Sequence, residues 1–173
     1  KVAEWTLDSI RTLRLKNGAA LRTKHRVPTL EEALLTTKGR VMVNLDKAYP
    51  IFDEIFPILE KTGTVEQIIM KGSKPVAEVK KDLGKYFDRI IYMPIVHLDR
   101  PGAMQQIDDF MKELHPVAFE LLFESDTCQL PKQVRTKLEG KSKIWYNTLW
   151  DTMAGGHDDD KSLENPDEGY GYL

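Results

Sequence analysis

Three polar residues stand at the ends of apolar segments, where their side chains could act together on a ligand. Asp46 ends the segment Val41–Asp46, and the two-residue period of a strand places Asn44 on the same face. Lys71 ends the next such segment, and Asn147 ends the last one. Because barrels and open α/β sheets place ligands at the carboxyl ends of parallel strands, we expect these groups to converge there. The alternative is that each is polar only because the chain leaves the core at that point.

Three more residues are candidates for binding a substrate at the same place. Glu120 lies alone inside the apolar run Ala118–Phe123, where a carboxylate is costly unless it is functional or has a structural Lys or Arg partner. Trp145 shares a face with Asn147 by the strand period. His157 precedes three aspartates and either contacts a ligand or metal, or belongs to a solvated acidic loop. The expected substrate-binding residues are therefore Lys71, Glu120, Trp145, Asn147 and His157.

The elements that must position these side chains alternate between short β-branched runs and longer segments of helical period, which is typical of βα units around a parallel sheet. The predicted strands begin about 25 residues apart and span Arg40–Asp46, Val65–Lys71, Arg89–Val96, Val117–Phe123 and Lys143–Thr148. The predicted helices between them are Ala48–Lys61, Pro75–Leu83, Ala103–Leu114 and Lys132–Leu138. His97 follows the third strand at its carboxyl end and could also line the site.

Two further helices are predicted before the first strand, over Thr6–Leu13 and Thr29–Thr37. Thr29 and Glu32 have the spacing of a capping box. The basic run Arg22–Arg26 between these helices is interpreted as a solvated loop. After the last strand the chain becomes acidic and rich in glycine, with no obvious closing element.

Composition limits the possible partners. The chain carries 25 Lys and Arg against 27 Asp and Glu, so a net charge of -2 argues against nucleic acid. The longest apolar runs are far shorter than the ~18 residues expected of a transmembrane helix. Cys128 is the only cysteine in the sequence, so an internal disulfide or a cysteine-rich zinc module is excluded.

Several segments resemble glycerophosphodiester phosphodiesterases, and in particular a bacterial branch of that family. The similar segments are Leu13–Gly18, Val27–Leu34, Gly39–Asp46, Ile144–Asn147 and Trp150–Asp160. The resemblance extends over nearly the whole chain, but between residues 65 and 140 it lies in the rhythm of strands and helices more than in motifs.

The resemblance implies part of a (β/α)8 TIM barrel, and an enzyme of lipid and glycerol metabolism that hydrolyses glycerophosphodiesters to an alcohol and glycerol 3-phosphate. It also implies a divalent metal, Mg or Ca, with Asp46 as a ligand. The family usually has Glu at that position, with Lys two residues later, so Lys71 is expected to supply the cation from the next strand. The family's His-Arg-Gly, its Glu-x-Asp metal pair and its second catalytic His are not found in this sequence, so no catalytic residue is assigned.

Five βα units are fewer than the eight that close a barrel. We therefore expect residues 1–173 to form a single, incomplete barrel domain that lacks the first two strands and the last. On its own it is expected to be inactive, with an oligomer or crystal partner covering its open sheet edges. The alternative function is a non-catalytic phosphate-binding or interaction module on a barrel scaffold. The compartment stays open, with export to the periplasm or beyond favoured over the cytoplasm.

Overall fold

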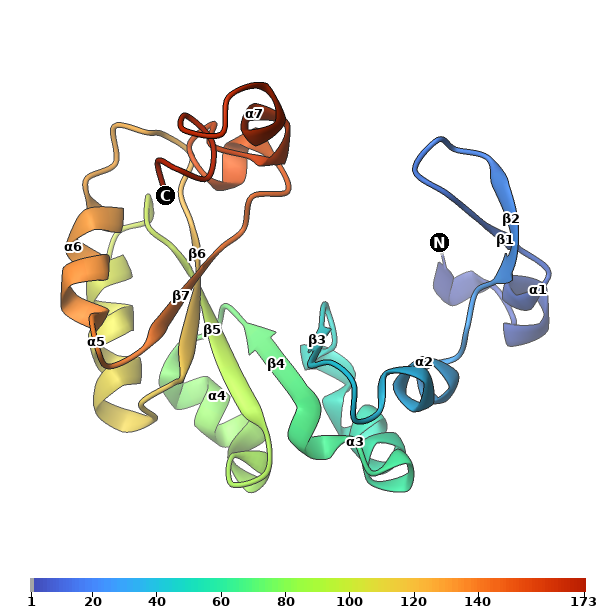
Figure 1. Ribbon diagram of the computed structural model, residues 1–173. Coiled ribbons are helices and arrows are strands. Elements are labelled where there is room, and N and C mark those ends of the chain that lie inside the picture. Colours follow the sequence, from blue (N-terminus) through green and yellow to red (C-terminus); the bar gives the residue numbers. More distant parts are fainter. Residues whose placement is uncertain (1) are drawn as a thin grey trace.

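Five parallel strands form a curled half-barrel in the computed structural model, which describes residues 2–173 (Figure 1). The strands follow one another in sequence order across the sheet: β3 (Val43–Leu45), β4 (Ile68–Gly72), β5 (Ile91–His97), β6 (Ala118–Leu122) and β7 (Lys143–Tyr146). Every neighbouring pair is parallel. The predicted α/β class and the partial set of βα units are thus confirmed.

Helices cover the convex side of this sheet (Figure 1). They are α3 (Phe52–Thr62), α4 (Val76–Leu83), α5 (Ala103–Glu113) and α6 (Leu130–Leu138), with short 3-10 helices at Tyr49–Ile51, Val65–Gln67 and Gly84–Tyr86. Apolar side chains from both layers form the core, and Phe52, Leu59, Phe110 and Phe119 are almost completely buried. The core therefore lies between the sheet and its helices, outside the hollow of the half-barrel.

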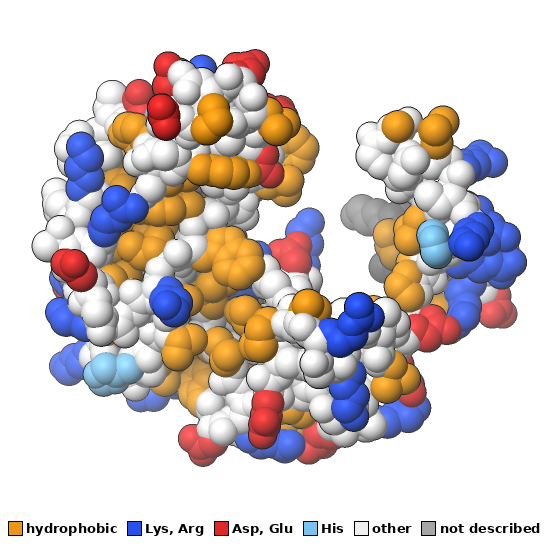
Figure 2. All heavy atoms as spheres, in the orientation of Figure 1, with side chains coloured by type: hydrophobic (Ala, Val, Ile, Leu, Met, Phe, Trp, Pro, Cys, Tyr) orange, Lys and Arg blue, Asp and Glu red, His pale blue; other side chains and the backbone are white. Residues whose placement is uncertain are grey.

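The concave face of the sheet is more open than the core. Val43 and Leu45 pack into the core, so the strand period turns Asn44 and the following Asp46 toward the hollow. Hydrophobic side chains are visible over β4–β7 in Figure 2, and Trp145 of β7 is 44% exposed. The polar residues of interest share this open face.

The predicted loop Arg22–Arg26 is wrong, because this segment is strand β2 (Arg22–Arg26) and pairs antiparallel with β1 (Arg14–Lys16). Arg22, Lys24 and Arg26 alternate with Thr23 and His25, which is the two-residue period of a strand. The high charge of the run favoured the loop interpretation instead. The hairpin joins α1 (Leu7–Arg11) to α2 (Leu30–Thr37). The capping box predicted for α2 is confirmed, since Thr29 and Glu32 exchange backbone and side-chain hydrogen bonds.

The acidic tail, in which the sequence indicates no closing element, is folded. After a 3-10 turn at Asp151–Met153, it forms helix α7 (Asp159–Glu164), which lies beyond the carboxyl ends of β6 and β7 (Figure 1). Ala154 forms a single parallel bridge to Phe123, just after the end of β6. The tail therefore extends the sheet by backbone pairing that no residue pattern indicates.

The observed strands differ from the predicted bounds where neighbouring turns use backbone groups that strand pairing would need. The amide groups of Arg40 and Val41 donate to the Thr37 carbonyl at the end of α2, so the first strand begins only at Val43. Val65–Gln67 is a 3-10 helix, which shortens the second strand at its start. Thr148 lies outside the last strand, and its hydroxyl donates to Asp159.

Candidate functional site

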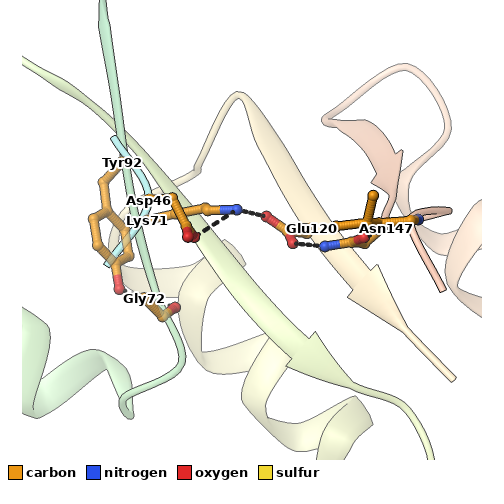
Figure 3. Close-up of polar contacts among 7 residues, drawn as sticks. Asp46, Lys71, Gly72, Tyr92, Glu120 and Asn147 are labelled. Carbon is orange, nitrogen blue, oxygen red and sulfur yellow. Dashed lines mark hydrogen bonds and ion pairs between the residues drawn. The ribbon is translucent and has the colours of Figure 1, made fainter. Parts of the chain in front are cut away.

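A continuous polar network connects the middle of β6 with the carboxyl ends of β3, β4 and β7 (Figure 3). The Lys71 ammonium lies 2.9 Å from Glu120 Oε2 and 3.5 Å from Asp46 Oδ1. The Asn147 amide donates to the other carboxylate oxygen of Glu120 at 2.9 Å. Four of the predicted site residues therefore converge, and the ion pair predicted as one alternative for Glu120 is confirmed with Lys71.

The sheet register explains why residues so far apart in sequence meet here. Asn44 lies opposite Ile69 and Leu45 opposite Met70, so the pairing continues from Asp46 to Lys71. Glu120 of β6 lies opposite Trp145, and Asn147 is two residues farther along. Alternate residues of parallel strands point the same way, so these polar side chains form one row across the hollow.

Burial and charge separate the roles of the three charged groups. Lys71 is 9% exposed and Glu120 is 2% exposed, so each needs the other as a partner. Asp46 has a side chain that is 65% exposed, and it faces the open hollow. One ammonium and two carboxylates leave this cluster with a net charge of -1, which favours a cation over a bare phosphate.

Two predicted substrate-binding residues stand apart from this hydrogen-bonded network. Trp145 shares the inner face and presents a partly exposed ring beside Glu120, where it could pack against a ligand. His157 is held inside the tail: its Nδ1 contacts the Glu168 carbonyl and its ring stacks on Tyr172 with centroids 3.6 Å apart. The structure thus gives His157 a packing role within the tail.

His97 is the histidine that the structure places on the inner face, since it lies opposite Leu122 at the carboxyl end of β5. Partial burial lowers the pKa of its imidazole, and the positive charge of Arg100 adds to that effect. Glu124, Asp99 and Glu120 oppose the shift. A neutral imidazole near neutral pH could accept or donate a proton at the rim of the site.

This lowered pKa predicts a loss of stability in acid. Below the unfolded value of 6.5, the unfolded chain binds a proton that folded His97 does not, so the free energy of unfolding decreases as the pH falls. Unfolding in urea between about pH 7.5 and 5 should show this decrease, and His97→Gln should reduce it. An NMR titration of the His97 ring with a midpoint at or above 6.5 would contradict the prediction.

The described residues do not by themselves fit a divalent metal. Within residues 2–173, no group of three or more His, Cys, Asp or Glu side chains is placed to hold a metal ion. Both Glu120 oxygens already accept hydrogen bonds, whereas Asp46 has an exposed carboxylate with one oxygen, Oδ1, 3.5 Å from Lys71. Mg and Ca take about six or more oxygen ligands, which is more than this network supplies.

Asn44 is a polar neighbour whose role the sequence only partly indicated. Its side-chain oxygen is buried and has no hydrogen-bond partner among the described residues. The two-residue period of a strand predicted that Asn44 shares a face with Asp46. That its side-chain oxygen lacks a partner follows only from the folded structure. It adds an unused acceptor to the first strand of the site.

Comparison with known proteins gives a partial match. A family model described as a domain of unknown function, DUF4996, matches residues 92–173, which run from β5 through the tail. That region contains Glu120 and Asn147, whereas Asp46 and Lys71 precede it. A search of curated proteins finds no match. Among the described residues, no helix is both long and apolar enough to cross a membrane.

Proposed function

We propose that this chain forms part of a barrel that hydrolyses glycerophosphodiesters to an alcohol and glycerol 3-phosphate. The observation that carries the proposal is the network of Asp46, Lys71, Glu120 and Asn147 at the carboxyl ends of strands in a half-barrel. The resemblance of Gly39–Asp46 and Ile144–Asn147 to this family supports the substrate class.

In this proposal, Glu120 acts as a positioning residue. It fixes the Lys71 ammonium from one carboxylate oxygen and the Asn147 amide from the other. Lys71 in turn lies 3.5 Å from Asp46 and so keeps the charge of that exposed carboxylate at the hollow. Trp145 supplies an apolar surface next to this charge for the carbon atoms of the substrate.

The proposed cofactor is a divalent cation, Mg or Ca. Asp46 is its proposed ligand in this chain, and the net charge of -1 in the cluster favours a cation there. The remaining oxygen ligands have to come from outside the described residues. When bound, such an ion would lower the negative charge on the phosphoryl oxygens and so favour attack on phosphorus.

The test measures release of glycerol 3-phosphate from glycerophosphocholine by the protein at its full encoded length. We expect turnover with Mg or Ca and its loss on chelation, whereas residues 1–173 alone should give none. Binding of glycerol 3-phosphate without turnover at full length would instead favour the second candidate, a non-catalytic phosphate-binding module. Robust turnover by residues 1–173 would refute the expectation that this segment lacks the catalytic residues.

The second candidate is kept because Lys71 already occupies the space between Asp46 and Glu120. A side-chain ammonium there can hold the two carboxylates without any metal. The charge balance disfavours this candidate, since a phosphate would approach a cluster that is already negative.

A further inference from the structure

The hairpin of β1 and β2 has an unusual distribution of charge for an exposed two-stranded sheet. Arg14 lies directly opposite Arg26, and Lys16 lies directly opposite Arg22. Lys24 is exposed between the two pairs, and no acidic residue interrupts either strand. Like charges directly opposite each other destabilise a sheet, and a two-stranded hairpin is marginal to begin with.

These charges are not neutralised inside the molecule. Within residues 2–173, none of the five hairpin cations forms an ion pair. Lys and Arg side chains gather on the surface over this hairpin, away from the half-barrel (Figure 2). A negatively charged partner would remove the repulsion between the opposed pairs.

Apolar side chains in the same segment identify the kind of partner. Large hydrophobic residues are exposed before, within and between the hairpin strands: Val2, Trp5, Leu7, Leu13, Leu15 and Leu21. Leu21, at the hairpin loop, is 65% exposed, and Trp5 is 52% exposed. Nucleic acid offers phosphates but little to bury leucine side chains, whereas the interface of an anionic bilayer accepts both cations and apolar groups.

We infer that the segment of residues 2–26, with the basic hairpin at its centre, binds the surface of anionic membranes. The cations lie against lipid phosphates while Leu21, at the hairpin loop, enters the interfacial region. The strand period turns Leu15 to the face opposite Arg14 and Lys16. This peripheral contact is independent of the proposed hydrolysis and uses none of the residues of the polar network.

Sedimentation with lipid vesicles tests this inference in residues 1–173. We expect binding to vesicles of phosphatidylcholine with phosphatidylglycerol, no binding to phosphatidylcholine alone, and weaker binding as salt increases. The double variant Lys16→Glu/Arg22→Glu should bind at least about 25-fold more weakly, at about fivefold per lost cation. A second variant, Leu21→Ser, should weaken binding while keeping its salt dependence.

The matched control is Lys81→Glu/Lys112→Glu, which makes the same change in net charge at exposed sites on α4 and α5. It should bind like the unmodified chain. Arg14→Gln/Arg26→Gln serves as a milder second test if charge reversal unfolds the hairpin, as monitored by circular dichroism. The inference is overturned if vesicle binding is absent, if the control weakens it equally, or if the hairpin variants lose binding only to an oligonucleotide or to a second copy of the chain.

Discussion

Replacement of Glu120 by alanine is expected to lower the free energy of unfolding by about 3–5 kcal/mol. Glu120 is 2% exposed and holds Lys71, which is itself 9% exposed. Its loss leaves a buried ammonium with one partner, Asp46, at 3.5 Å and leaves the Asn147 amide without its acceptor. Urea unfolding followed by circular dichroism measures the change.

The double variant Lys71→Met/Glu120→Leu distinguishes a buried charge from simple loss of packing. Replacing both members of a buried ion pair by apolar residues of similar size is commonly neutral or stabilising, so we expect most of the lost stability to return. Glu66→Ala, at an exposed position, should change stability by less than about 0.5 kcal/mol. A double variant as unstable as Glu120→Ala would contradict the account of the pair.

Replacement of Asp46 by alanine should have the largest effect on activity. In the protein at its full encoded length, we expect metal-dependent hydrolysis to fall at least about 100-fold, since even groups that only orient a metal ligand are worth about 10- to 100-fold. Stability should fall by less than about 1 kcal/mol, because the Asp46 side chain is 65% exposed and Lys71 keeps Glu120. Glycerol 3-phosphate release and thermal unfolding give the two measurements.

In the metal-free chain, replacement of Asp46 is expected to strengthen the binding of phosphate, although it lowers activity in the metal-loaded protein. Asp46→Asn changes the charge of the cluster from -1 to neutral, so glycerol 3-phosphate should bind residues 1–173 more tightly, by about fivefold for about 1 kcal/mol of repulsion removed. Asp88→Ala, an exposed site outside the network, should change neither activity nor binding. Unchanged hydrolysis in Asp46→Ala, or weaker phosphate binding in Asp46→Asn, would argue against the proposed role of Asp46.

The alternation of short apolar runs with segments of helical period was sufficient to predict the strands of the half-barrel. The strands around Leu45, Met70, Val96, Leu121 and Ile144 lie in predicted segments because short apolar runs between helical segments have few other ways to bury their side chains. Boundaries moved at Val43 and Ile68, where turn hydrogen bonds made by neighbouring segments used the same backbone groups. Such competition depends on the folded geometry, and a residue pattern does not record it.

For the site, the sequence by itself determined which polar residues stand at strand ends, since that follows from the two-residue period and the edge of each apolar run. Only the tertiary structure decided that Lys71 pairs with Glu120, 49 residues away, and that Asn147 completes the same network. It likewise decided that His157 stacks on Tyr172 inside the tail and that the basic strand Arg22–Arg26 pairs with Arg14–Lys16. Strand register and loop packing set these contacts, and both depend on interactions between segments far apart in the chain.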